Sequence, residues 1–518
     1  MQVPLGWYER TITSVLFTID IVFRKRTMHR LHPGVRSVMK RRTQVVVAAA
    51  VGTLLLAASG QAQSPNRYML RADPSQQSAI SQTYGLNVVQ QLSQPQAVVV
   101  TGPASVSPDD FVDQVRADPR VTAFELVRNA QLPEGSARAQ QTAPVGSLTP
   151  ALRSLNSTTF FGNPVWGSYV TQPALTQIDW AWNPAAFRHS VGSNTPGYGA
   201  VVAVIDTGVD PSHPALQGVL LPGYDFVHNQ PGASDWADLD QSTAAILNQS
   251  TSAILNQSTS AILNGSQVVQ LNQSTAAILD QSTAAILNST TLPAEFGHGT
   301  MVAGLIHLVA PGAQILPLKA FSANGSAANS DIIRAIYYAV DNGANVINMS
   351  FTEADLSSEL LLAVNYANRH GVVCVSSVGN TAQTAPAYPA SLGEVFGVGS
   401  VSAAGTLSTF SSYGPDLLTL VAPGEGLITT YPGNHWAGVS GTSFSAALVS
   451  ANVAVGLGSE NQQAGNPADY SDSDDAMNAI ASVNAYDPTL GWGVLDVAQM
   501  SQIQHLVGQN HKHEPREQ

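Results

Sequence analysis

Three short glycine-containing segments constrain this chain more than any other feature, because each places a reactive side chain where backbone can approach closely. The segments read VVAVIDTG at 201–208, GHGT at 297–300 and SGTS at 440–443. The Ser443 hydroxyl is a weak nucleophile on its own, but His298 can accept its proton near neutral pH and Asp206 can stabilise the imidazolium. The segments therefore predict a serine nucleophile activated by a histidine base.

Each segment also has a purely structural interpretation. An apolar strand ending in Asp206 is common at the carboxyl edge of parallel sheets, and most single histidines are packing or surface residues. A Gly-Thr-Ser segment is typical of a helix start, with Thr442 or Ser443 capping the apolar run 444–453. All three segments coincide in order within one domain length, which favours the catalytic interpretation.

The order Asp206, His298, Ser443 resembles that of the subtilisin-like serine proteases, and residues from about 165 to 500 carry the resemblance. Three further segments, 410–415, 421–424 and 491–495, are also similar to that family. The resemblance implies an α/β fold with a parallel central sheet and helices on both faces. It also implies a serine endopeptidase that hydrolyses peptide bonds through an acyl-enzyme.

Attack on a carbonyl creates an oxyanion, which requires hydrogen-bond donors aimed at the developing charge. Asn380 follows the apolar run 372–375 and the segment 376–379, which together read as a strand and its end. The resemblance assigns one donor to the Asn380 side-chain amide and a second to the backbone N–H of Ser443. An Asx turn that caps the strand is the structural alternative, and both roles are compatible.

An extended substrate is expected along the segment that follows the strand-like run 345–349, since a peptide can pair with an exposed strand edge. The expected substrate-binding residues, some of them implied by the resemblance, are Ser350, Phe351, Thr352, Ser377, Val378, Gly379 and Ala387. The family commonly has glycines where this chain has Thr352, Glu353 and Ala387. Side chains at these positions should narrow the pocket, so we expect small to medium apolar or neutral residues to be preferred there.

The front of the chain reads as an export signal. Residues 39–62 combine a basic start, an apolar run at 45–56 and small residues at 60–62. A membrane anchor is the alternative, but the apolar run is short for a span. We therefore expect a protein secreted to the extracellular space or periplasm, without a membrane span in its mature form. Residues 1–38 precede this signal and are interpreted as a non-native extension, with Met39 as the initiator.

Residues 63–131 have the pattern of a small α+β unit, with strands expected at 97–100 and 121–127 and a helix at 108–118. This unit resembles the inhibitory propeptide of subtilisins, which assists folding and then blocks the cleft until it is cut away. An independent binding domain is the alternative. The linker at 132–160 is rich in Pro, Ser, Gln and Ala and is expected to contain the processing site.

The catalytic domain is expected to cover 161–505, with a polar tail at 506–518. It contains an insertion at 241–288, which consists of six eight-residue units related to QSTAAILN and separates Asp206 from His298 by 92 residues. A regular repeat with Ile-Leu in most units favours a small solenoid or short helical turns over disorder. Replication slippage in a surface loop and a platform that contacts substrates both explain it.

Charge and cysteine content exclude several classes of protein. Residues from 156 onward contain six Lys or Arg and 26 Asp or Glu, so nucleic acid is not an expected partner. The single cysteine, Cys374, permits no internal disulfide and lies in an apolar run, where it should be buried rather than reactive. No cofactor or metal is expected; the acidic segment 469–475 lacks the spacing of a known calcium loop, which favours a solvated loop and helix cap.

Protein or peptide substrates and the chain's own propeptide are therefore the expected partners. A rival hypothesis is a non-catalytic surface or adhesion protein that uses the same fold to display the octapeptide repeat. A third is an enzyme that cleaves only its own propeptide. The presence of Asp206, His298, Asn380 and Ser443 together favours a catalyst over the adhesion protein.

Overall fold

The computed structural model describes residues 66–92, 96–103, 106–132, 157–172, 195–239, 277–278, 293, 295–463, 487 and 489–493. Every structural statement below concerns these residues. Several predicted features lie outside them: the extension 1–38, the signal peptide 39–62, most of the linker 132–160 and of the repeat 241–288, the acidic segment 469–475 and the tail 506–518. Those expectations stay predictions.

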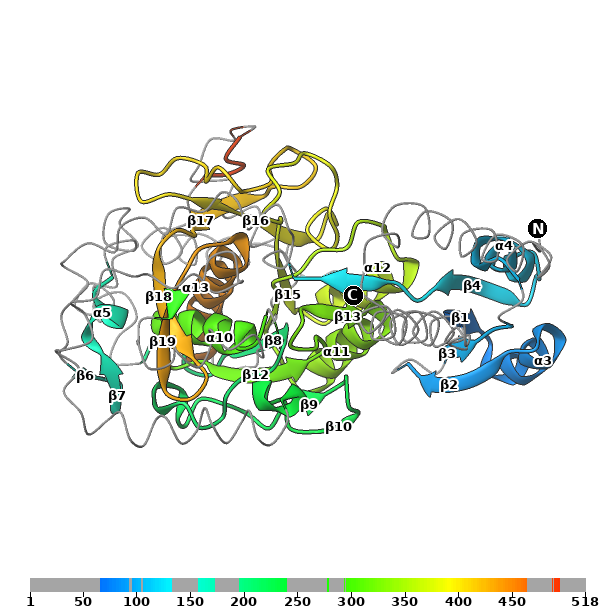
Figure 1. The fold of residues 1–518 in the computed structure, drawn as a ribbon, viewed down its shortest axis with the longest axis horizontal. Coiled ribbons are helices and arrows are strands. Elements are labelled where there is room, and N and C mark those ends of the chain that lie inside the picture. Colours follow the sequence, from blue (N-terminus) through cyan, green and yellow to red (C-terminus); the bar gives the residue numbers. More distant parts are fainter. Residues whose placement is uncertain are drawn as a thin grey trace, which may run out of the picture. The chain divides into compact units, whose positions relative to one another are not determined.

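An eight-stranded sheet forms the centre of the main domain, which comprises the described residues of 157–493 (Figure 1). The strand order is β10 (Gln230–Pro231), β9 (Tyr224–Asp225), β12 (Gln314–Lys319), β8 (Val201–Asp206), β14 (Val346–Met349), β15 (Val373–Ser377), β16 (Val395–Val401) and β17 (Leu420–Pro423). Every pairing from β9 to β17 is parallel, and β10 alone joins antiparallel. Near-continuous Val, Ile and Ala runs suit strands that are buried on both faces.

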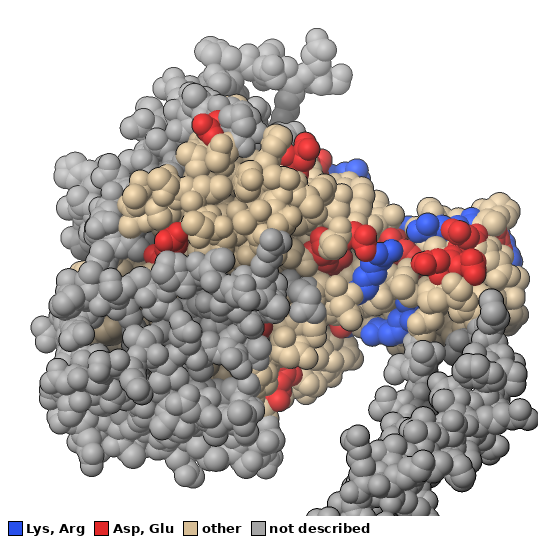
Figure 2. Space-filling model, turned by 45° about the horizontal axis from the view of Figure 1, so that its top comes forward, with Lys and Arg blue, Asp and Glu red and all other residues tan. Residues whose placement is uncertain are grey.

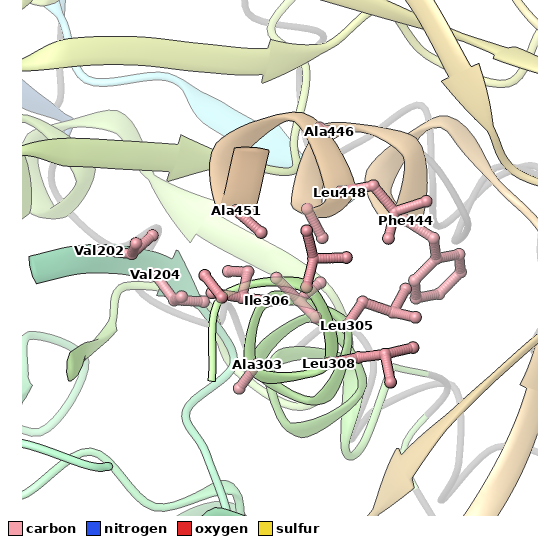
Figure 3. Packing of buried hydrophobic residues seen from close by; sticks show 14 of the residues in the cluster. Val202, Val204, Ala303, Leu305, Ile306, Leu308, Phe444, Ala446, Leu448 and Ala451 are labelled. Carbon is pink, nitrogen blue, oxygen red and sulfur yellow. The ribbon is translucent and has the colours of Figure 1, made fainter. Parts of the chain in front are cut away.

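Helices cover both faces of this sheet, so the predicted α/β fold is confirmed. Strand β8 shows the division: Val202 and Val204 face a core shared with α10 (His298–Val309) and α13 (Thr442–Gln463). Figure 3 shows these side chains packed together with Leu305 and Leu448. The alternate residues of β8 face a second core beneath α11 (Asn329–Asp341) and α12 (Ser358–Arg369). The two-residue period of a strand thus builds both layers.

The N-terminal subdomain, the described residues of 66–132, is a four-stranded antiparallel sheet with two helices. Its strand order is β2 (Asn87–Gln91), β3 (Ala97–Thr101), β1 (Arg67–Ala72) and β4 (Val121–Leu126), and its helices are α3 (Pro74–Tyr84) and α4 (Pro108–Arg116). The predicted strands and helix are present, although the helix ends at Arg116 rather than Asp118. Sequence patterning missed β1, β2 and α3, and in α3 only Ile80 is buried, so that helix has no apolar stripe to reveal it.

The two faces of this small sheet have different partners. Tyr68, Phe111 and Phe124 pack ring against ring in the subdomain's own core. Met69 and Val99, on the opposite face, join the core that contains α11 and α12 of the main domain. The segment then continues into β5 (Asn129–Gln131), which pairs antiparallel with β13 (Ser326–Ala328) of the main domain.

The remaining elements close the outer side of α10. A hairpin of β6 (Ser157–Phe160) and β7 (Asn163–Trp166) leads into α5 (Gly167–Val170), and a ribbon of β18 (Leu427–Tyr431) and β19 (His435–Val439) pairs with β11 (Ala277–Ile278). The short helices η5 (Pro214–Leu216) and η6 (Asp235–Asp238) complete the list. Phe160 packs into the main core, so four residues that the sequence assigns to the linker belong to this domain. None of the helices in the described ranges has the length and apolar composition that crossing a bilayer requires.

Candidate active site

A histidine and a carboxylate meet where β8 ends and α10 begins. His298, the first residue of α10, places Nδ1 at 2.8 Å and 2.9 Å from the two carboxylate oxygens of Asp206. Asp206 Oδ1 also accepts a hydrogen bond of 2.7 Å from the backbone N–H of Thr207, which fixes the orientation of the carboxylate. Nδ1 therefore carries the proton toward Asp206, and Nε2 is the ring nitrogen that can act as a base.

Ser443 lies at the start of α13, on the same side of the sheet. Its neighbour Phe444 brings its ring to 5.5 Å from the His298 imidazole, between ring centroids, so the fold brings together a serine and a histidine that lie far apart in the sequence. The Ser443 hydroxyl donates to the carbonyl oxygen of Ser350 at 3.3 Å. Asp206, His298 and Ser443 are all fully buried in the full-length chain.

Asn380 follows β15 and is held by the residue before the serine. Its side-chain oxygen accepts hydrogen bonds of 2.9 Å from both the backbone N–H and the hydroxyl of Thr442. The NH2 end of the amide is therefore directed away from Thr442. Gly379 N–H donates to the same hydroxyl at 3.2 Å and adopts a φ of +96°, a conformation that favours glycine. Because Thr442 fixes the amide orientation, Asn380 can present a pre-oriented donor.

The predicted substrate-binding residues divide into two groups. Ser350 lies beside Ser443 and Thr352 beside Gly379: the Ser350 hydroxyl donates to the Ser443 carbonyl at 3.0 Å, and a Cβ built on Gly379 would lie 3.5 Å from the Thr352 methyl. The second group lies in the surrounding structure. Phe351 packs at a tilt against Phe321 inside the core, Val378 packs with Ala390, Ser377 is fully buried, and the Ala387 N–H donates to Ser391. The buried side chains of Phe351 and Val378 belong to the core.

Sequence patterning missed a second carboxylate behind the pair of His298 and Asp206. Asp235, in η6, accepts a hydrogen bond of 2.6 Å from the Thr207 hydroxyl, and its other oxygen accepts from the hydroxyl and the backbone N–H of Thr300. The Thr207 hydroxyl in turn accepts from Gly299 N–H at 3.0 Å. Asp235 thus clamps the end of β8 to the first turn of α10 and caps a helix whose own N-cap, Gly297, has no side chain. Burial raises the pKa of Asp235 to about 7.

A buried lysine completes this network. Lys319, at the end of β12, has no exposed surface and donates from Nζ to the carbonyl oxygens of Thr207 and Phe321 and to Asp238, at 2.7 Å, 2.9 Å and 2.7 Å. All three ammonium hydrogens thus have acceptors. The signal that could have revealed it is a lysine within the otherwise apolar run 315–321, since lysine is almost never buried without a partner.

The cysteine thiol and the side chains that could bind a metal ion are the remaining groups to consider. Cys374 lies fully buried in β15, as the sequence predicted, and burial raises the pKa of its thiol to about 12. A thiol of that pKa is not a nucleophile at neutral pH. Over the described ranges, no group of three or more His, Cys, Asp or Glu side chains is arranged to hold a metal ion.

Comparison with known proteins gives concordant matches. Residues 197–493 match the family model described as the subtilase family, Peptidase S8. The chain is 31% identical over 362 residues to a thermophilic serine proteinase of Bacillus sp. (strain AK1), a match that covers 67% of this chain and 76% of that relative. It is 30% identical over 314 residues to thermitase of Thermoactinomyces vulgaris, covering 59% of this chain and 87% of that one.

A solved structure with a similar fold is that of fervidolysin from Fervidobacterium pennivorans, a keratinolytic enzyme related to subtilisin. The two share a TM-score of 0.57 and 20% sequence identity, over 85% of this chain and 61% of that chain. At this identity the likeness concerns the fold alone. The match covers less than two thirds of the fervidolysin chain.

Proposed function

Because the chain belongs to the subtilase family and is a subtilisin-like serine endopeptidase, we propose that Ser443, His298 and Asp206 are its catalytic triad and that it is made as a secreted, self-processing precursor. The observation that carries the proposal is the bond between His298 Nδ1 and Asp206 beside the Ser443 helix. In the reaction, the Ser443 hydroxyl attacks the scissile carbonyl while His298 Nε2 takes its proton.

The tetrahedral intermediate is stabilised by the Asn380 side-chain amide and the Ser443 backbone N–H, which donate to the oxyanion. His298 then gives its proton to the leaving amine, and the acyl-enzyme forms. Water, deprotonated by the same imidazole, hydrolyses the ester and regenerates Ser443. Loss of one oxyanion donor costs about 10²–10³-fold in turnover, a magnitude established in a subtilisin, and we expect it for Asn380→Ala.

The N-terminal subdomain is proposed to be an inhibitory propeptide that occupies the substrate cleft. Support comes from β5, which pairs with β13 in the register Ala130 to Ala327, as an extended substrate pairs with a strand edge. Leu132 N–H then donates to the Gly325 carbonyl at 3.0 Å, and both Ala130 and Leu132 are fully buried. Sequence patterning placed substrate along Ser350–Thr352 and missed this opposite wall. We place the processing cut further along the chain than Leu132, within the predicted linker 132–160.

Charged contacts hold this subdomain on α12. Glu125 accepts from the Ser357 hydroxyl at 2.6 Å and from the backbone N–H groups of Ser358 and Glu359 at 3.0 Å and 3.2 Å, so it adds to the local cap, Ser357, at the start of this helix. Arg71 makes a two-bond ion pair with Glu359 at 2.7 Å and 2.6 Å. Contacts of this kind support a role in assisting the folding of the main domain before removal.

The decisive experiment compares the precursor with its Ser443→Ala variant, with Ser402→Ala, a serine in the 401–407 turn, as the matched control. We expect the wild type and the control to lose roughly their first 130–160 residues, to cleave an unstructured protein and to react with a serine-directed phosphonate. Ser443→Ala should do none of these. An inert, unlabelled wild type would favour the adhesion protein, and processing with labelling but without substrate cleavage would favour a self-limited enzyme.

Export is the part of the proposal that rests on the sequence. The basic start and apolar run of 39–62 support a signal peptide. Expression of the full-length Ser443→Ala variant, which should not process itself, tests it by cell fractionation: the proposal predicts product in the medium or periplasm, with an N-terminus near residue 63. A product retained in the cytoplasm with residues 39–62 intact would contradict it.

A further inference from the structure

One carboxylate beside the substrate cleft has no hydrogen-bond partner. Glu353 is only 4% exposed, and neither of its carboxylate oxygens is hydrogen-bonded among the described residues. Its position is fixed, since its N–H and carbonyl form two antiparallel bonds with Tyr388, of 2.7 Å and 2.9 Å. A buried carboxylate without hydrogen bonds destabilises a fold. The contacts that Glu353 makes within the main domain therefore do not explain why a glutamate stands at this position.

The charges that face Glu353 identify its surroundings. Burial raises its pKa to about 8; the charges of Glu125 and Asp355 raise it as well, whereas that of Arg128 lowers it. Arg128 and Glu125 belong to the N-terminal subdomain, while Asp355 follows Glu353 by two residues. The Arg128 guanidinium forms an ion pair with Asp355, and their side chains are 47% and 62% exposed. A cationic side chain from the bound segment thus lies beside two carboxylates of the main domain.

Arg128 is held in register with the cleft. Its N–H donates to the Asn329 side chain at 3.2 Å, and its carbonyl accepts from the Asn329 N–H at 2.9 Å. It directly precedes β5 and lies four residues before Leu132. Any peptide that pairs with β13 as β5 does therefore brings its corresponding side chain to Asp355 and Glu353. In Figure 2 the blue atoms and many of the red ones lie toward the right of the molecule, whereas the described surface of the larger body is mostly tan.

We propose that Glu353 and Asp355 form an acidic subsite of the mature enzyme, which selects substrates with Arg or Lys at the position that Arg128 occupies in the precursor. The proposal rests on the proposed function, because it takes β5 as a model of bound substrate. Once the N-terminal subdomain leaves, it takes with it both the cation and the cap that Glu125 provides. The two carboxylates then remain in a domain with few cations of its own, so they attract a basic side chain and repel an acidic one.

The test uses the self-processed enzyme and three peptides with the chain's own sequence 126–137, carrying Arg, Gln or Glu at position 128. Because the pair with Asp355 is half exposed, we expect kcat/KM to favour Arg over Gln about 3–5-fold and Arg over Glu about tenfold or more. In Asp355→Asn/Glu353→Gln the three values should converge. Asp416→Asn, which removes one carboxylate at an exposed site and so matches Asp355→Asn, should keep the wild-type ratios.

The outcomes separate this proposal from the proposed function. Equal cleavage of all three peptides by the wild type, or an unchanged ratio in the double variant, overturns the subsite and leaves the protease standing. No cleavage and no phosphonate labelling of the wild type would instead overturn the proposed function. If the double variant does not mature, the single variant Asp355→Asn can be tested instead, since that side chain is exposed. It should lower the ratio of kcat/KM for the Arg peptide over the Gln peptide to below about 2-fold.

Discussion

Two buried carboxylates in this enzyme have raised pKa values, and their surroundings differ. Asp235, behind the proposed triad, accepts hydrogen bonds on both oxygens from residues of its own domain, and burial raises its pKa to about 7. Glu353, beside the proposed substrate cleft, accepts none from the part of the chain that the structure describes, and burial raises its pKa to about 8. A satisfied carboxylate is a permanent part of the fold, whereas an unsatisfied one is suited to a partner that comes and goes. Raised pKa values alone would not have distinguished them.

The largest expected effect comes from Asp235→Asn. The amide cannot accept on both sides, so the Thr207 and Thr300 contacts are broken on one of them. We expect about 3 kcal/mol less stability in denaturant unfolding of the mature enzyme. Because α10 carries His298, kcat should fall about 10–100-fold, with KM within about threefold of the wild type. Glu353→Gln should lower stability by less than about 1 kcal/mol. Equal losses in the two variants would contradict the conclusion that Asp235 is part of the fold and Glu353 is not.

The second prediction concerns the precursor and pH. The folded pKa of Glu353 lies above its ordinary value of 4.5, so its stability contribution is present below pH 4.5 and is lost as pH rises toward 8. Between these limits we expect the Ser443→Ala precursor to lose about 3 kcal/mol through this group. Adding Glu353→Gln should flatten that part of the profile in thermal unfolding between pH 5 and pH 8. An unchanged slope would show that Glu353 is not buried neutral in the precursor.

The third prediction concerns His307, a buried side chain whose pKa is lowered rather than raised. His307 in α10 has no hydrogen-bond partner on either ring nitrogen among the described residues and packs edge-to-face on Phe160. Burial, aided by His213, lowers its pKa from 6.5 to about 4. The contribution of His307 to the stability of the folded state is therefore fully present above pH 6.5 and is lost as pH falls toward 4.

Replacing this imidazole should remove the loss. We expect His307→Leu to be more stable than the wild type by about 2 kcal/mol at pH 5, relative to the difference at pH 8, in thermal unfolding of the mature enzyme. His370→Leu, a change at an exposed histidine at the end of α12, serves as the control and should show no such pH-dependent gain. A pH-independent difference in His307→Leu would mean that this imidazole does not titrate on unfolding.

The smallest expected effect tests the hydroxyl that joins Asp235 to α10. Thr207→Val keeps the side-chain shape but loses the bond to Asp235 and the acceptor for Gly299 N–H. We expect the free energy of unfolding to fall by about 1 kcal/mol and kcat to fall several-fold. Thr207→Ser retains the hydroxyl and should retain both. If serine and valine behaved alike, the clamp would not pass through this hydroxyl.

Much of the fold could be predicted from sequence because its signals are local. The run at 201–206 is apolar, ends in a carboxylate and is followed by glycine, and the structure makes it β8. The family resemblance then supplied the parallel sheet, which local patterns cannot give. By contrast, β1 and α3 were missed because their burial depends on partners distant in the chain, and only Ile80 of α3 is buried.

The same limit applies to the site. Asp206, His298 and Ser443 each stand in a short motif, so residue type and order predicted them. Asp235 lies in no motif, and its role arises from contacts to Thr207 and Thr300, 28 and 65 residues away. Glu353 was expected to narrow a pocket, but two of its charged neighbours, Glu125 and Arg128, come from the N-terminal subdomain, more than 200 residues earlier in the chain. Side-chain chemistry that depends on tertiary partners cannot be read from local sequence.

The central claim is that Ser443 is the nucleophile of a triad with His298 and Asp206. The most direct measurement is peptide mapping by mass spectrometry of the processed enzyme after reaction with a serine-directed phosphonate. The account predicts one adduct, on Ser443, that forms at least a hundredfold more slowly after His298→Ala. An adduct on another serine, or protein cleavage that persists without any adduct, would contradict it.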